Sequence, residues 1–258
     1  MPENEVIKNL ISTIDKYIRP VTFPVAVKFQ KKKDILSGKF KRPLTDIGHP
    51  IAVCQGVTLA RRLGWTMIFG KDDHACPVGL IVLGYYSPKK ILEGTVAYPY
   101  YAETIEIAKI MEQRDKFFPE KSIEEIWLSP LHKAEFKPDL VLVYGNAAQI
   151  ARMAQGANYR TGKGVDSKTF GRTACGHYLA RAYLGQECSL VVPSGGERVF
   201  ANTMDDELIF SIPANCFNNV AIGIEAVHKQ GLSRFPTYFH GMSMKPEFPP
   251  SYVNALKE

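Results

Sequence analysis

Apolar residues recur at every third or fourth position between Val6 and Ile18, which predicts an amphipathic helix over residues 5–18. Similar spacings predict further helices over 55–63, 77–83, 104–113, 147–154 and 177–184, with a last one capped by Asn215. Short apolar runs predict strands over 25–29, 65–69, 95–98, 140–144, 188–192 and 208–212. The segment Ser194-Gly195-Gly196 is expected to be a turn, and the proline-bearing tail beyond residue 235 is expected to be irregular.

Two cysteine-led segments of the chain resemble each other. Cys54–Gly64 and Cys175–Gly185 each begin with cysteine, contain Leu-Ala-Arg and end in Leu-Gly ten residues later, although the triplets are offset by one position. Twelve residues beyond the closing glycine stands Cys76 in the first copy and Glu197 in the second. The echo favours a duplication; a chance match stays open, because the shared helical triplet is short.

The expected fold class is therefore α+β. We expect two pseudo-duplicated α/β halves, 1–135 and 136–258, with a mixed sheet packed around a shared pocket. At 258 residues the chain is long enough for both halves to form one compact unit.

Composition and charge narrow the function classes. The hydrophobic fraction of 45% and the charged fraction of 22% are those of an ordinary globular protein, and no apolar run reaches membrane-spanning length. The opening residues are acidic, so we expect no secretory leader and a cytoplasmic protein without membrane association. The net charge of +6 comes in short basic clusters, so a small anionic substrate is expected and nucleic acid is not. A homo-oligomer stays open.

Five cysteines, an odd number at irregular spacing, point away from a disulfide framework in a chain of this size. Cys54, Cys76 and Cys175 each precede a short, glycine-terminated helix. A helix start presents free N–H groups and the positive end of the backbone dipole, which lower a thiol pKa. We therefore predict that these three sulfurs gather in one pocket, and we interpret Cys188 and Cys216 as structural.

Three thiolates suit a [4Fe–4S] cluster whose fourth iron is open to substrate or bound by another side chain. The leading hypothesis is a cytoplasmic iron–sulfur enzyme of the lyase or sulfur-transfer type, acting on a small anionic or sulfur-bearing substrate. Structural zinc with His74 or His177 as fourth ligand stays open. So do a non-enzymatic binding or accessory protein, and a metal-free thiol oxidoreductase with Cys54 or Cys175 as nucleophile.

The remaining candidates surround those cysteines in the sequence. His74 and His177 each lie two residues from a cysteine and are candidate proton shuttles, or plain loop histidines. Lys28, Arg198 and Arg172 are candidate substrate clamps; Arg198 follows a glycine turn that forms either an anion nest or a turn with a surface salt bridge. Nucleotide-binding and serine-hydrolase motifs are absent from the sequence, which argues against those activities.

Several motifs resemble those of one known family. They are Pro24-Val-Ala-Val-Lys-Phe29, Cys54-Gln55, Ala75-Cys76-Pro77, Pro138-Asp-Leu-Val-Leu-Val143, Ala174-Cys175-Gly176 and Asp206-Glu-Leu-Ile-Phe-Ser-Ile-Pro213. Across residues 20–230 the chain resembles the domain-of-unknown-function family 169 (DUF169). That family occurs among anaerobic and other prokaryotes, which suits an oxygen-sensitive cluster, but the resemblance implies little else about function.

Overall fold

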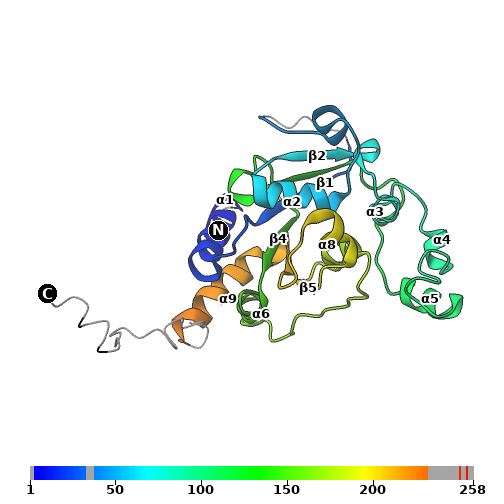
Figure 1. Ribbon diagram of the computed structural model, residues 1–258. Coiled ribbons are helices and arrows are strands. Elements are labelled where there is room, and N and C mark those ends of the chain that lie inside the picture. Colours follow the sequence, from blue (N-terminus) through cyan, green and yellow to red (C-terminus); the bar gives the residue numbers. More distant parts are fainter. Residues whose placement is uncertain (1–2, 33–37, 232–249, 251–253, 255–258) are drawn as a thin grey trace.

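Six β-strands form one open sheet in the order β2-β3-β1-β4-β6-β5 (Figure 1). The computed structural model describes residues 3–32, 38–231, 250 and 254, so most of the predicted tail lies outside the described residues. The strands are β1 (Val25–Gln30), β2 (Met67–Gly70), β3 (Glu125–Pro130), β4 (Leu140–Gly145), β5 (Ser189–Val191) and β6 (Leu208–Pro213). Helices and strands share one sheet-centred fold, so the α+β class is confirmed.

The sheet is antiparallel at every neighbouring pair, so the expectation of a mixed sheet is wrong. β1 and β2 point the same way, as expected of a strand–helix–strand unit, but β3 lies between them and is antiparallel to both. β6 separates β4 from β5 in the same manner. An inserted strand thus splits each parallel pair. The two sets of three strands meet where β1 pairs with β4.

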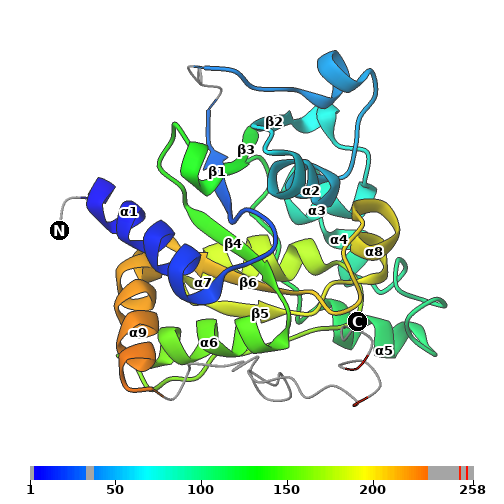
Figure 2. The same ribbon diagram turned by 60° about the vertical axis from the view of Figure 1, so that its left-hand side comes forward.

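Helices cover both faces of the sheet (Figure 2). One face carries α2 (Val53–Leu63), α3 (Pro77–Val82), α8 (Gly195–Ala201) and the π-helix η5 (Gly176–Arg181), which continues into α7 (Ala182–Gly185). The other carries α1 (Glu3–Thr13) with its continuation η1 (Ile14–Ile18), α6 (Ala147–Asn158) and α9 (Phe217–Lys229). The short turns of helix are η2 (Pro43–Ile47), η3 (Lys71–Asp73), η4 (Leu131–Lys133) and η6 (Ala214–Cys216).

Alternating residues of each strand feed two separate cores. In β4, Leu140 and Leu142 pack into the core beneath α2 and η5, whereas Val141 and Val143 pack beneath α1, α6 and α9. This period of two follows from the pleat, which directs successive side chains to opposite faces. The predicted cysteine site lies on the first of these faces.

The local predictions failed in the middle of the chain and before β6. Residues 93–101 form turns instead of the strand predicted over 95–98, and β3 was not predicted. Glu125 is a residue type typical of a surface segment, which hid the strand pattern of β3. In the fold its carboxylate is buried and accepts hydrogen bonds from Arg42 and from the Trp127 indole. The turn predicted at Ser194-Gly195-Gly196 is the start of α8.

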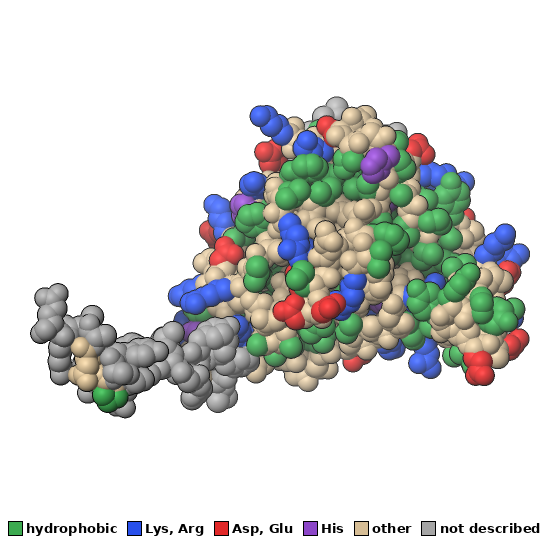
Figure 3. All heavy atoms as spheres, viewed as in Figure 1, with side chains coloured by type: hydrophobic (Ala, Val, Ile, Leu, Met, Phe, Trp, Pro, Cys, Tyr) green, Lys and Arg blue, Asp and Glu red, His purple; other side chains and the backbone are tan. Residues whose placement is uncertain are grey.

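The outer surface has a separate helical region at one end. There α4 (Lys89–Leu92) and α5 (Ile105–Glu112) project from the body (Figure 1), and Tyr100 and Tyr101 are exposed. Basic and acidic side chains are interspersed over the face drawn in Figure 3. Within the described residues, no helix is both long enough and apolar enough to span a bilayer.

Candidate functional site

The three predicted cysteines all stand at helix starts on one face of the sheet. Cys54 is the second residue of α2, whose first turn is closed by a 2.8 Å hydrogen bond from the Ala52 N–H to the Gln55 side chain. Cys76 caps α3, and its Sγ accepts the Gly79 N–H at 3.3 Å. Cys175 immediately precedes η5. Local capping chemistry therefore helps to set the positions of the Cys54 and Cys76 thiols.

These thiols lie within electrostatic range of one another. Burial is the main factor that raises the pKa of Cys175, and the negative charges of Glu197, Cys76 and Cys54 raise it further. Glu197 and Cys76 likewise raise the pKa of Cys54. The Cys54 side chain also packs against Ala201 with Cys76 beside it. We call Cys54, Cys76, Cys175 and Glu197 the cysteine–glutamate group.

The prediction that helix starts lower these thiol pKa values is wrong for two of the three. Burial raises the pKa of Cys54 to about 12, and the N–H groups of Gln55 and Cys54 offset only part of that rise. Burial also raises the pKa of Cys175 well above its ordinary value, although a hydrogen bond from the Gly176 N–H lowers it in part. Desolvation outweighs the backbone here because each side chain is only 8% exposed. Both thiols carry protons at neutral pH unless a cation displaces them.

Glu197 is the member of the group that the sequence did not assign to the site, although the echo placed it at the counterpart of Cys76. Its side chain is buried and closes the first turn of α8: the Ser194 N–H donates to Oε2 at 2.9 Å, and the Ser194 hydroxyl donates to the same atom. The sequence signal was available, because Ser-x-x-Glu is the capping-box pattern that opens a helix. Burial raises the pKa of this carboxyl above its ordinary value.

A buried tyrosine faces the cysteine–glutamate group. The side chain of Tyr178 on η5 is fully buried, and its hydroxyl has no hydrogen-bond partner among the described residues. Burial raises its pKa, and the charges of Tyr144, Glu197, Cys54 and Cys175 raise it further, which places the hydroxyl near them. A buried hydroxyl without a partner costs free energy, so its position fits a site completed by a bound group.

A hydrogen bond and an ion pair between distant parts of the sequence hold α2 against α8 and the segment that follows it. The Thr58 hydroxyl donates to the carbonyl of Ala201 at 2.7 Å, and this bond joins the helix of Cys54 to the helix of Glu197. Arg61, one turn further along α2, is paired with Glu207 just ahead of β6. The two helix starts are therefore fixed relative to each other by contacts distant in sequence.

The two candidate histidines are buried; His74 lies in the connection between η3 and α3, whereas His177 lies in η5. Burial lowers the pKa of His74 to about 3, and its ring stacks on Phe69 and Tyr85, with centroids 5.0 and 5.4 Å apart. Burial and the nearby Arg181 lower the pKa of His177 to about 4. His177 Nε2 lies 3.3 Å from Asp115 Oδ1. Both imidazoles are neutral at neutral pH, and their proton-shuttle roles stay predictions.

The three candidate clamps each have an intramolecular partner. Lys28 Nζ lies 2.9 Å from Asp139 Oδ1. Arg172 pairs with the buried Glu112, and Arg198 Nη1 donates to the Met204 carbonyl at 2.7 Å. Arg198 also lies 3.3 Å from Asp205, as in the salt-bridge interpretation of this segment. The three cations share no partner, so their combined role as a substrate clamp gains no support.

The thiols and the carboxylate of the cysteine–glutamate group are suitable ligands for iron, but they are not close enough together to bind a single metal ion. Thiolates and a carboxylate are ligands that iron accepts. Within the described part of the chain, no three Cys, His, Asp or Glu side chains are grouped so as to hold one metal ion. An iron–sulfur cluster spreads its ligands, because each thiolate binds a different iron.

The fold and site together define an α+β protein with a split antiparallel sheet and a buried cysteine–glutamate group. The chain belongs to the DUF169 family, whose model, described as "Uncharacterised ArCR", matches residues 13–222. The predicted family resemblance is thereby confirmed. No curated protein and no solved structure matched the chain.

Proposed function

We propose that this protein binds a [4Fe–4S] cluster through Cys54, Cys76 and Cys175 and acts as an iron–sulfur enzyme. The observation that carries the proposal is the meeting of these thiols with Glu197, from four separate helix starts on one face of the sheet. Residues that span 54–197 in the sequence would gather by chance only rarely, and capped helix starts hold Cys54, Cys76 and Glu197 there. A cytoplasmic location is part of the proposal.

Electrostatics supports a cationic occupant. Cys54, Cys76 and Glu197 each raise the pKa of Cys175 when charged, so the group cannot ionise together at neutral pH without compensation. A bound cation reverses this, because metal coordination deprotonates thiols and balances their charge. Backbone N–H groups already approach the sulfurs, as that of Gly79 does at Cys76. Such bonds tune cluster-ligating thiolates.

Glu197 is the group that we propose for the fourth iron. It stands where the sequence echo places the counterpart of Cys76, and its raised pKa leaves it able to hold a proton. When bound, an iron with an exchangeable position supplies Lewis-acid chemistry. Glu197 would then yield that position to substrate and accept or donate a proton at the oxygen not bonded by Ser194.

The proposed reaction is of the lyase or sulfur-transfer type on a small anionic or sulfur-bearing molecule. Cys76 is more exposed than Cys54 and Cys175, so substrate would approach from its side. Arg198 follows Glu197 on α8 and is the candidate cation nearest to it in the sequence. Its carbonyl and carboxylate partners would have to give way for it to bind substrate.

We also infer that the two halves arose by duplication and share the site as a pocket. Reading outward from the β1–β4 pair, the strands run β1-β3-β2 on one side and β4-β6-β5 on the other, each with the third strand of its half in the middle. The Cys54 helix precedes β2 and the Cys175 helix precedes β5. This repetition of topology supports the sequence echo.

The test is iron content after anaerobic purification. We expect a brown protein with about four irons per chain. Serine at Cys54, Cys76 or Cys175 should abolish iron binding, whereas Cys188→Ser should retain it. Glu197→Gln should retain the cluster but lose turnover. Equal iron in all the cysteine variants would contradict the ligand assignment.

A non-enzymatic accessory protein is the second candidate. The observation that favours it is the 8% exposure of both Cys54 and Cys175, which restricts access for a substrate. In that case the wild-type chain would show no turnover, and Glu197→Gln would change only the stability and the spectrum of the cluster. A colourless, metal-free protein under anaerobic conditions would favour structural thiols alone.

A further inference from the structure

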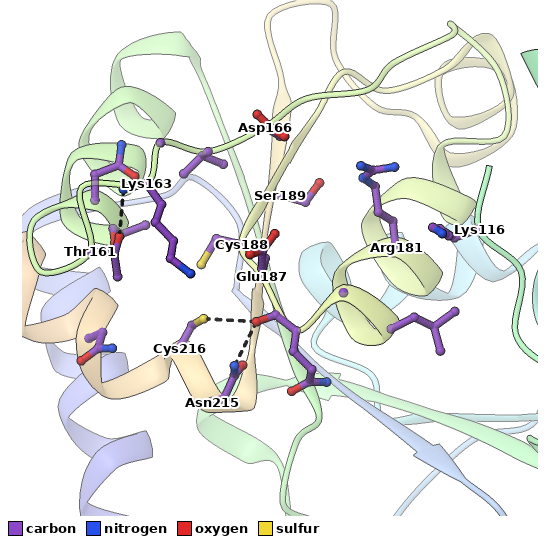
Figure 4. Close-up of a pocket in the computed structure, with 18 of the residues that line it drawn as sticks. Lys116, Thr161, Lys163, Asp166, Arg181, Glu187, Cys188, Ser189, Asn215 and Cys216 are labelled. Atoms are coloured by element: carbon purple, nitrogen blue, oxygen red, sulfur yellow. Dashed lines mark hydrogen bonds between the residues drawn. The ribbon is translucent and has the colours of Figure 1, made fainter. Parts of the chain in front are cut away.

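One hollow of the described structure lies away from the cysteine–glutamate group. It measures about 1010 Å³ and opens between the loop after α6, the η5–α7 helix and the start of α9 (Figure 4). Cys188 and Cys216, the two cysteines interpreted from the sequence as structural, both line it. Cys54, Cys76 and Cys175 do not line it.

The two thiols of this hollow lie beside each other. Cys188 directly precedes β5, and Cys216 stands at the N-terminal cap of the 13-residue helix α9. The Cys188 thiol and backbone N–H approach the Cys216 sulfur as donors, and the Cys216 thiol, when protonated, donates to the Gln186 carbonyl oxygen 3.9 Å away. Figure 4 shows the two sulfurs on the same side of the hollow, with the Lys163 side chain reaching toward them. Both residues are partly exposed.

The two thiols differ in acidity as a result. Hydrogen bonding from the Cys188 thiol and N–H lowers the pKa of Cys216 to about 7, with a contribution from the Lys163 charge and against burial and the negative charge of Glu187. The same hydrogen bond and burial raise the pKa of Cys188. Cys216 is therefore the thiolate near neutral pH, and Cys188 keeps its proton. This is the division between an attacking and a resolving thiol.

We propose that Cys216 and Cys188 form a thiol–disulfide exchange site whose substrates are small anionic disulfides that enter this hollow. The charge of the lining favours that class. Three cations, Lys116, Lys163 and Arg181, face two carboxylates, those of Asp166 and Glu187. The hollow has room for a peptide-sized molecule, because small-molecule sites commonly enclose a few hundred to a thousand Å³.

The exchange proceeds in two balanced steps. The Cys216 thiolate attacks one sulfur of the substrate disulfide, the substrate S–S bond breaks, and one substrate thiolate leaves and takes a proton from water. Cys188 then loses its proton to solvent and attacks the Cys216 sulfur of the mixed disulfide. The second substrate thiol leaves with a proton. Two protein thiols are oxidised to one disulfide, and the substrate disulfide is reduced to two thiols.

The test treats the reduced full-length protein with glutathione disulfide, which is anionic, and maps the modified cysteines by peptide mass spectrometry. The wild-type chain should release two glutathione molecules and form a Cys188–Cys216 disulfide. Cys188→Ser should stop at a glutathione adduct on Cys216, and Cys216→Ser should leave Cys188 unmodified. A Cys188→Ser variant that stays folded, by circular dichroism, and accumulates no adduct on Cys216 would overturn the proposal.

Rates test the roles of pKa and charge. At pH 7 Cys216 should react about threefold faster than a cysteine of the unfolded chain, since its larger thiolate fraction outweighs its lower intrinsic nucleophilicity. Lys163→Gln should slow the reaction with glutathione disulfide about two- to fivefold. The same variant should not slow the reaction with cystamine, a cationic disulfide. A wild-type preference for cystamine would overturn the substrate class.

Discussion

The guanidinium of Arg61 is fully buried and forms a bidentate ion pair with Glu207, with Nη1–Oε1 and Nη2–Oε2 distances of 2.5 and 2.9 Å. Its Cζ also lies 4.1 Å from the ring centroid of Tyr144 on β4. Arg61 belongs to the helix of Cys54, whereas both partners belong to the second half of the chain. The pair therefore fixes α2, which carries Cys54, to the second half of the chain, which carries Glu197.

Arg61→Met should lower the free energy of unfolding by about 3–5 kcal/mol, because it leaves the Glu207 carboxylate without its main partner. Urea denaturation measures this. The matched control is Arg62→Met: Arg62 reaches the same carboxylate at 3.4 Å from a more exposed position and should contribute less than about 1 kcal/mol. Equal losses in the two variants would contradict a special role for the buried guanidinium.

The buried pair of Asp115 and His177 should give compensating pH effects. Burial raises the pKa of Asp115 to about 7, so this group stabilises the fold at low pH and loses that contribution as pH rises toward 7. Burial lowers the pKa of His177 to about 4, so protonation in the unfolded chain destabilises the fold as pH falls from 6.5 toward 4. Between about pH 4 and 6.5 the two slopes oppose each other.

Single substitutions should expose each slope. Relative to the wild-type chain, Asp115→Asn should make the slope of stability with pH more positive between about 4 and 6.5, by up to about 1.4 kcal/mol per pH unit, and His177→Gln should make it more negative. Urea unfolding at a series of pH values measures both as differences from the wild-type slope, which also contains the contributions of His74 and Glu197. Changes of the same sign in the two variants would contradict the neutral pair.

The crossing of α6 and α9 should not tolerate a methyl group. A Cβ on Gly223 would lie 2.0 Å from the carbonyl oxygen of Gly156, so the helices would have to separate. Gly223→Ala should destabilise the fold by at least about 1–3 kcal/mol, while Gly185→Ala, whose Cβ meets nothing within 4 Å, should not. Because this crossing lies on the opposite face of the sheet, iron bound per folded chain should be unchanged.

Tyr178→Phe should have different effects on the metal-free protein and on the protein with a bound cluster. Without metal, removal of a buried hydroxyl that has no partner should leave stability unchanged or raise it by about 1 kcal/mol. With a cluster bound, the variant should lose iron to a chelator faster than the wild-type chain if the hydroxyl bonds the occupant. The control is Tyr183→Phe, because Tyr183 is a half-buried tyrosine whose ring packs against Phe29 and not against the cysteine–glutamate group. Slower unfolding of the loaded variant would argue against that bond.

The apolar periodicity determined most of the helices and strands, because burial of one face is a local property of the sequence. The same holds for the placement of Cys54, Cys76 and Cys175, since the caps and glycines that bound their helices are near neighbours. β3 escaped prediction because Glu125 reads as a surface residue until Arg42, 83 positions away, neutralises it. The Ser194–Glu197 capping pattern was present in the sequence and could have revealed α8.

The tertiary structure alone decided the acidity of the thiols. At a helix start the local N–H groups lower a thiol pKa, whereas burial by other parts of the fold raises it. Only the contribution of burial depends on the rest of the chain. At Cys54 and Cys175 burial outweighs the backbone, whereas at Cys216 a neighbouring thiol and Lys163 prevail. The sequence determined where the sulfurs lie along their helices. Desolvation and long-range neighbours, which exist only in the folded chain, determined which of them ionises.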